Sequence, residues 1–188
     1  MKNTKFEGVI AYPITPFDEN EKIDITIYKK LLEKLIVSGS HAVAPLGSTG
    51  VMPYLNDDEK EAITEATVSQ VNGRVPILVG VSNLTTERTI YHAKAAEKAG
   101  ADAVIVQDMA VVKMAAEGIG NIREDFHIPL HASTQCAIRT PEHAAFLEGL
   151  GFSRLILERE LSLQQIKAIR EAVSCELEFF VHGALCVC

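Results

Sequence analysis

The sequence predicts an α/β fold of the (β/α)8 TIM-barrel type, present as an incomplete barrel of about seven strands in one domain over residues 1–188. Short apolar runs alternate with helical patterns along the whole chain. Successive runs start 23 to 34 residues apart, which is the length of one strand-plus-helix step. A doubly wound open sheet is the alternative, and the lack of G-x-G-x-x-G after the first run weakens a dinucleotide-binding version of it.

The expected strands are nearly continuous apolar runs, which is typical of parallel strands covered on both faces. They are residues 8–12, 42–46, 75–81, 102–106, 129–133, 154–158 and 177–182.

Helix-start signals precede the expected helices between these runs. Two of them, Asn56 with Glu59 and Ser162 with Gln165, have the spacing of a capping box. The others are Asp24, Thr85 and Thr140, the last followed by proline at the first helical position. A shorter helix is expected over 108–117, followed by a connection over 118–126.

Composition narrows the function classes. The chain has 25 acidic and 18 basic residues and a net charge of −7, so a nucleic-acid or anionic-membrane partner is not expected. No apolar run reaches the roughly 18 residues of a membrane span, and the first residues lack the apolar core of a signal peptide. We therefore expect a cytoplasmic protein whose four cysteines are thiols or metal ligands.

The most distinctive polar segment is Gly47-Ser48-Thr49-Gly50, called here the glycine-hydroxyl turn, which follows the second expected strand. Two glycines allow a tight backbone turn with exposed N–H groups, and two hydroxyls add further donors. Such a turn can hold a carboxylate or phosphate, although the same composition also occurs in simple turns.

Residues 8–106 resemble the dihydrodipicolinate synthase and N-acetylneuraminate lyase family of class I aldolases. The matching segments are residues 8–17, 47–50, 72–81 and 99–104. The resemblance implies that the turn binds the carboxylate of a small 2-oxo acid such as pyruvate. Gly47, Ser48, Thr49 and Gly50 would bind this substrate, with Thr49 on its carboxylate and Ser48 in the proton-relay position.

The sequence lacks two residues that the resemblance to this family would require. Family members form a Schiff base through a lysine at the end of the sixth strand and relay protons through a tyrosine on the fifth. Here no lysine lies between Lys113 and Lys167, and no tyrosine follows Tyr91. Because only an amine forms an imine, we expect lyase ancestry without lyase turnover in this chain.

Residues 104–188 resemble the collagenase-like peptidase family of unknown catalytic type, family U thirty-two. The matching segments are residues 104–108, 129–135, 159–162 and 180–186. The resemblance implies a barrel, and in some members a cysteine-bound iron–sulfur cluster with RNA or ubiquinone hydroxylation. Cys186 matches the first cluster ligand, but the next would lie beyond Cys188, so a cluster is expected only if the chain is a fragment of a longer protein. No other cofactor is expected.

The candidate residues of the second half are His131, Gln135, Arg159, Glu160 and His182. The two histidines and Glu160 fall near expected strand ends, where such groups can bind a metal or transfer protons. Arg159 and Glu160 can instead form a local ion pair.

We interpret the sequence as a chimera of a lyase-like half (1–106) and a peptidase-like half (107–188), shortened at its C-terminus. An incomplete barrel would expose strand edges, through which the chain can form a homo-oligomer. Three functions remain open: a class I aldolase-type lyase, a peptidase-family hydrolase or hydroxylase, and a non-catalytic scaffold.

Overall fold

The computed structural model describes residues 6–117 and 127–183. The chain divides into two compact units, unit 1 (Met1–Val104) and unit 2 (Ile105–Cys188). Each unit is an α/β assembly in which parallel strands alternate with helices along the chain.

The strands of unit 1 pair in chain order. β1 (Ile10–Ala11) pairs in parallel with β2 (Ala42–Val43). A parallel bridge joins Val43 to Ile77, immediately before β3 (Leu78–Gly80). The carbonyl of Ile77 then accepts backbone hydrogen bonds from residues 102 and 103 at the start of β4 (Ala103–Val106), of which the first two residues belong to unit 1. Parallel pairing of consecutive strands is the pattern of the predicted βα repeat.

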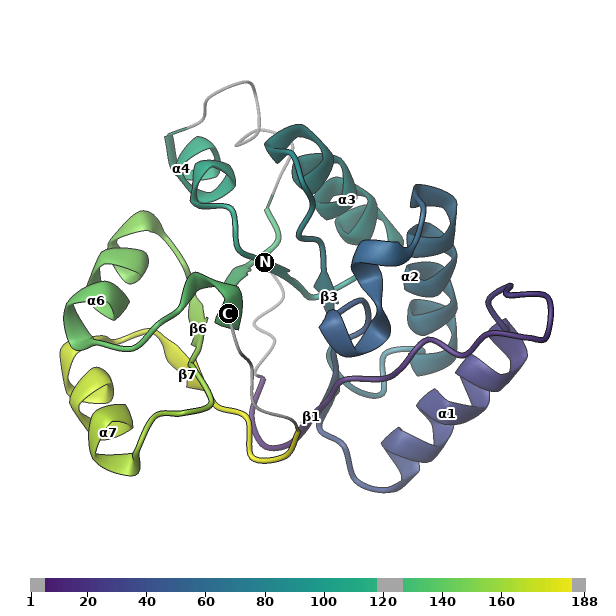
Figure 1. Cartoon of the computed structure of the whole chain (residues 1–188), viewed down its shortest axis with the longest axis horizontal. Coiled ribbons are helices and arrows are strands. Elements are labelled where there is room, and N and C mark those ends of the chain that lie inside the picture. Colours follow the sequence, from purple (N-terminus) through teal and green to yellow (C-terminus); the bar gives the residue numbers. More distant parts are fainter. Residues whose placement is uncertain (1–5, 118–126, 184–188) are drawn as a thin grey trace. The chain divides into compact units, whose positions relative to one another are not determined.

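Three helices accompany these strands: α1 (Ile25–Val37), α2 (Asp57–Val71) and α3 (Thr86–Ala99). α1 packs against α2, and α2 packs against α3 (Figure 1). In the first contact the buried hydroxyls of Tyr28 and Thr67 lie 2.8 Å apart. This bond lets the tyrosine be buried without losing its polar partner.

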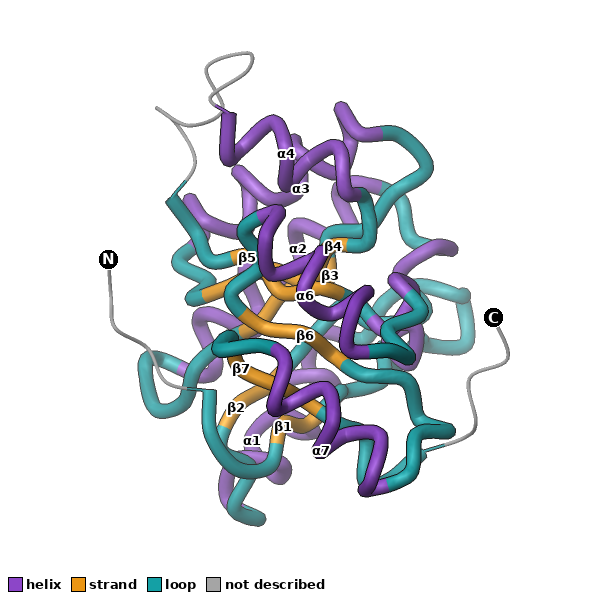
Figure 2. Tube along the Cα trace, turned by 90° about the vertical axis from the view of Figure 1, so that its left-hand side faces the viewer, coloured by secondary structure: helices purple, strands orange, loops and turns teal. Residues whose placement is uncertain are grey.

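In unit 2, β6 (Arg154–Ile156) lies between β5 (Leu130–Ala132) and β7 (Glu176–Glu178) in a parallel arrangement (Figure 2). The helices are α4 (Met109–Glu117), α6 (Pro141–Leu150) and α7 (Leu163–Ala172). α6 packs against both α4 and α7.

The predicted helix starts are confirmed. The side chains of Asp24, Thr85 and Thr140 accept backbone hydrogen bonds at the starts of α1, α3 and α6. Both predicted capping boxes, at Asn56 and Ser162, are formed. The expected connection over 118–126 lies outside the described residues.

The seventh strand differs from the prediction. It covers Glu176–Glu178 instead of 177–182, and Val181 is exposed. Its partner β6 ends at Ile156, and the last bond between them runs from the N–H of Leu157 to the carbonyl of Glu178. The apolar run continues past this bond, but a strand needs a partner for its backbone groups as well as apolar side chains.

No described helix combines the length and the apolar character needed to cross a membrane.

Candidate functional site

The glycine-hydroxyl turn lies directly after β2 and contains a short 3-10 helix, Ser48–Gly50. Within it the N–H of Gly50 donates to the carbonyl of Gly47 at 3.0 Å. From outside it, the hydroxyl of Thr15 donates to the carbonyl of Gly50 at 2.7 Å. The turn is therefore held from within and from the segment that follows β1.

Gly80, the last residue of β3, fixes the position of this turn. Its N–H donates to the carbonyl of Pro45 at 3.0 Å. A Cβ atom at position 80 would collide with the backbone carbonyl of Leu46, so only glycine permits this approach. Gly80 was not among the residues predicted from the sequence, although a glycine at the end of an apolar strand is a signal of close backbone approach.

Ser48 and Thr49 are both exposed. Within the described part of the chain, neither their hydroxyls nor their backbone N–H groups have a hydrogen-bond partner. Two hydroxyl and two amide donors lie on consecutive exposed residues, and donors of this kind can bind a carboxylate. The structure thus keeps the four predicted residues of the turn together with free donors.

The end of β6 offers a carboxylate where the lyase resemblance calls for an amine. Glu158 is fully buried, and its Oε1 lies 3.5 Å from Nη2 of Arg139. Its Oε2 is buried and has no hydrogen-bond partner in the part of the chain that the structure describes. A buried, half-satisfied carboxylate is costly and is a common feature of functional sites.

Arg159 and Glu160 do not form the local ion pair that was one interpretation of the sequence. The guanidinium of Arg159 lies 4.1 Å from the ring centroid of Phe180, a cation–π contact. Glu160 is exposed and has no ion pair among the described residues. The attraction of Arg159 to the phenyl face, which sequence spacing does not reveal, holds the arginine against the segment after β7.

His131 lies in β5 directly opposite Arg154 of β6, and both are buried. Arg154 in turn pairs with Glu176 and lies 3.9 Å from Oε2 of Glu178, both on β7. Burial, followed by the charge of Arg154, lowers the pKa of His131 to about 3. The imidazole is therefore neutral at pH 7, the form that accepts a proton or binds a metal.

Arg154, Glu158 and Glu178 were not predicted from the sequence as site residues. The available signal was the presence of charged residues inside otherwise apolar strand candidates.

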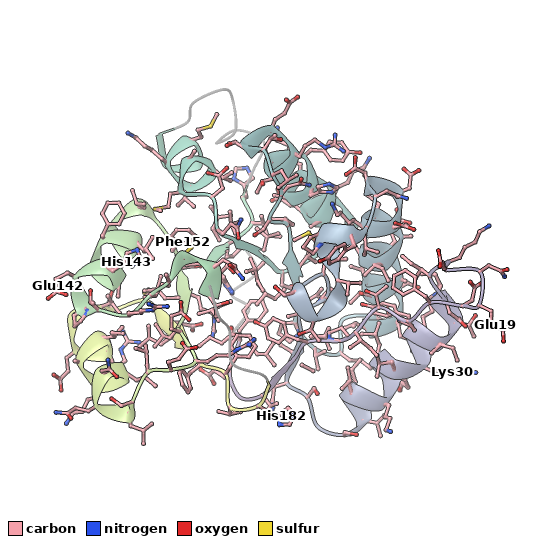
Figure 3. The ribbon with its side chains drawn as sticks, in the orientation of Figure 1. Glu19, Lys30, Glu142, His143, Phe152 and His182 are labelled. Carbon is pink, nitrogen blue, oxygen red and sulfur yellow. The ribbon has the colours of Figure 1, made fainter. Side chains whose placement is uncertain are left out.

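The remaining candidates of unit 2 are not brought together with His131 as metal ligands. Gln135 is exposed in the 3-10 helix Thr134–Cys136, and His182 is exposed after β7 (Figure 3). Over residues 6–117 and 127–183, no three His, Cys, Asp or Glu side chains form a group that could hold a metal ion. Cys186, the candidate cluster ligand, lies outside the described residues.

Comparison with known proteins gives two sets of relatives. The sequence profile of Peptidase family U32 matches residues 55–188, and the 23S rRNA 5-hydroxycytidine C2501 synthase of Escherichia coli is 50% identical over 88 residues. The 4-hydroxy-tetrahydrodipicolinate synthase of Thermotoga neapolitana is 37% identical over 114 residues. The family match begins at residue 55, so it extends well into the half that resembles the lyases.

Solved structures support the fold. A dihydrodipicolinate synthetase of Pseudomonas aeruginosa, described as putative, superimposes with a TM-score of 0.75 and 29% identity, covering 89% of this chain and 61% of the other. A dihydrodipicolinate synthase of Rhodopseudomonas palustris gives a TM-score of 0.78 at 21% identity, covering 92% and 62%. The chain thus has the fold of part of a TIM-barrel protein, as predicted.

The chain spans 12% of the length of the rRNA hydroxycytidine synthase and 38% of that of the Thermotoga synthase. Its sequence resembles both groups, and its fold is that of the dihydrodipicolinate synthases. Because the family profile covers well over half of the sequence, the chain belongs to Peptidase family U32.

Proposed function

We propose that this chain is an aldolase-type protein that binds the carboxylate of a small 2-oxo acid, such as pyruvate, at the glycine-hydroxyl turn. The observation that carries the proposal is the set of exposed donors on Ser48 and Thr49, which have no partner among the described residues. The similarity to 4-hydroxy-tetrahydrodipicolinate synthases supports the assignment.

The geometry favours binding over full turnover. A class I aldolase needs an amine that attacks the keto carbon and loses water to form an imine. The β6 end carries Glu158, Arg159 and Glu160, none of which forms an imine. The chain would therefore hold the acid through Thr49 and Ser48 without joining it covalently at β6.

The test is isothermal titration of pyruvate into the wild-type chain and into Ser48→Ala and Thr49→Val variants. Each hydroxyl donates to a charged oxygen, a bond worth about 1.5–3 kcal/mol, so each variant should bind about tenfold more weakly or worse. Ser69→Ala removes an exposed hydroxyl from α2 and should bind like wild type. Saturable binding that is equally strong in the Ser48/Thr49 double variant would refute the assignment.

Borohydride reduction in the presence of pyruvate tests the absence of imine chemistry. We expect no pyruvyl adduct on any lysine by peptide mass spectrometry. An adduct would show that the chain carries its own imine-forming amine for this substrate.

A second candidate is a role in RNA-base hydroxylation, favoured by the 50% identity to the hydroxycytidine synthase over 88 residues. The described cysteines do not fit a four-thiolate cluster. Cys136 is buried with its pKa raised to about 11 by desolvation, and no group of three metal-ligating side chains exists in the described ranges. Anaerobic reconstitution followed by iron analysis tests this candidate. We expect far less than four irons per chain, and near-stoichiometric loading would favour hydroxylation instead.

A further inference from the structure

Unit 1 contains a pocket of about 410 Å³ that no part of the proposed carboxylate site lines. Residues of α2 and α3, which lie side by side in Figure 1, form its walls, together with the end of β3 and residues 81–82. Its volume lies within the range of small-molecule sites. Its apolar lining consists of Leu46, Met52, Val79, Val81, Ala95, Ala96 and Ala99.

Lys60 of α2 lines this pocket and is only 8% exposed. It lies on the buried face of the helix, together with Ile63 and Thr64. Among the described residues its amine has neither a hydrogen bond nor an ion pair. Buried lysines are normally paired with a carboxylate, so this arrangement is unusual.

Two carboxylates on the same helix are already bound by other groups. Asp57 pairs with Arg88 and lies 2.8 Å from Nε2 of His92. Glu61 accepts a hydrogen bond of 2.6 Å from the hydroxyl of Tyr91.

The buried position changes the protonation of this amine. Partial desolvation lowers the pKa of Lys60 because the ammonium form loses part of its hydration beside the apolar lining. Burial, together with the positive charges of Lys60 and Arg88, lowers the pKa of His92 to about 4. His92 therefore adds no charge to the pocket at pH 7. An amine with a lowered pKa is a stronger nucleophile at neutral pH, because more of it carries a free electron pair.

We infer that Lys60 is a reactive amine that forms an imine with a small uncharged aldehyde bound in this pocket. The nitrogen of the neutral amine attacks the carbonyl carbon and forms a C–N bond. The carbonyl oxygen then leaves as water with the two amine hydrogens, and a C=N double bond remains. The step is balanced and needs no oxidant or reductant.

The residues that line the pocket indicate which class of ligand it can bind. Besides Lys60, the ionic groups of the pocket wall are two lysines, Lys94 and Lys98, and two glutamates, Glu61 and Glu65. The charges of these four groups cancel one another, and the rest of the lining is mostly apolar. The apolar lining favours an uncharged aliphatic or aromatic aldehyde.

The test is reductive trapping of the native chain with benzaldehyde and cyanoborohydride at pH 7, followed by quantitative peptide mass spectrometry. Lys60 should be labelled several-fold faster than the exposed Lys30, because the pocket holds the aldehyde beside this amine. Pyruvate used in place of benzaldehyde should leave Lys60 unlabelled.

Three variants serve as controls for this labelling experiment. Lys60→Arg keeps the positive charge but cannot form an imine, so adduct formation at position 60 should vanish. Ala95→Leu fills the pocket while leaving Lys60 in place and should reduce its labelling at least about fivefold, by steric exclusion. Lys34→Arg, at an exposed position of α1 outside the pocket, should label like wild type. Circular dichroism confirms that each variant is folded.

Preferential labelling of Lys94, Lys98 or surface lysines, or labelling of Lys60 that Ala95→Leu leaves unchanged, would overturn the inference. A Ser48→Ala variant should trap benzaldehyde normally. Failure of the carboxylate site and failure of the amine pocket are therefore distinguishable.

Discussion

His131 and Arg154 face each other across β5 and β6, and each side chain is less than 5% exposed. Arg154 extends this contact to Glu176 and Glu178 on β7, so one polar layer crosses three parallel strands. Burial, followed by the charge of Arg154, keeps the imidazole of His131 neutral, so acid should affect the stability of unit 2 through this group.

Acid should destabilise the chain through His131. The pKa of its imidazole is about 3 in the folded chain, against an ordinary value of 6.5. The unfolded chain therefore binds a proton that the folded chain does not. The contribution of His131 to the free energy of unfolding is therefore fully present above pH 6.5 and is lost progressively as the pH falls toward 3. Urea unfolding should show a loss of at most about 3 kcal/mol from this group between pH 7 and pH 4.

His131→Gln should remove most of this pH dependence. A residual slope should remain because the pKa of His92 is also lowered, to about 4, and shifts stability in the same direction. An unchanged pH profile in His131→Gln would contradict the neutral state of this imidazole.

Breaking the polar layer at Arg154 should cost more stability than breaking a surface pair. Arg154→Met leaves the largely buried carboxylate of Glu178 without this cation, and we expect a loss of about 3–5 kcal/mol in the free energy of unfolding. Arg154→Met combined with Glu178→Leu should recover part of that loss, because both charges are then gone.

Lys167→Ala is the matched control for a surface ion pair. Lys167 lies 4.0 Å from Glu171 with both side chains exposed, so the change should stay within about 0.5 kcal/mol. Equal losses for Arg154→Met and Lys167→Ala would show that burial does not strengthen the Arg154 contact.

Gly80→Ala should disturb the glycine-hydroxyl turn without touching it directly. The added methyl group would collide with the carbonyl of Leu46, so the chain must shift just before the turn. We expect a loss of about 1–3 kcal/mol in stability and weaker pyruvate binding by isothermal titration.

Gly149→Ala is the control for Gly80→Ala, because the added methyl group has space there. A methyl group at Gly149, in the last turn of α6, meets no atom within 4 Å, so alanine should be tolerated there and stabilise the helix by less than about 1 kcal/mol relative to glycine. If Gly80→Ala were as stable as Gly149→Ala, the close approach of β3 to residue 46 would not exist.

The two capping boxes should each contribute measurably to stability. Asn56→Ala and Ser162→Ala remove the side chain that accepts a backbone N–H at the starts of α2 and α7. Each should cost about 1 kcal/mol in chemical denaturation. Ser69→Ala, within α2, removes no capping bond and should change stability by less than about 0.5 kcal/mol.

Much of the fold was predictable because its signals are local. Asn56 and Glu59 lie three residues apart, and the bonds they make close within one helical turn. The order of strands and helices follows from the same kind of short-range pattern. The seventh strand was misjudged because its end depends on where β6 stops, and apolar spacing contains no information about a partner strand.

The candidate site also combines residues that local sequence identifies with residues whose surroundings depend on distant segments. Ser48 and Thr49 were predicted because the whole turn is contiguous in sequence. Arg154 and Glu158 were not predicted, because a charged residue in an apolar strand becomes meaningful only when its neighbours are known. Arg159 contacts Phe180, which lies 21 residues further along the chain, and does not form the ion pair with Glu160 that was one interpretation of the sequence.

The sequence by itself determined the βα order, the helix starts and the donor-rich turn after β2, since each depends on residues a few positions apart. Only the tertiary structure decided that Gly80 approaches the carbonyl of Leu46, that burial and Arg154 keep His131 neutral, and that Lys60 has no carboxylate partner among the described residues. The physical reason is that burial and charge pairing depend on which distant segments pack together, and they determine the protonation of a side chain as strongly as its residue type does.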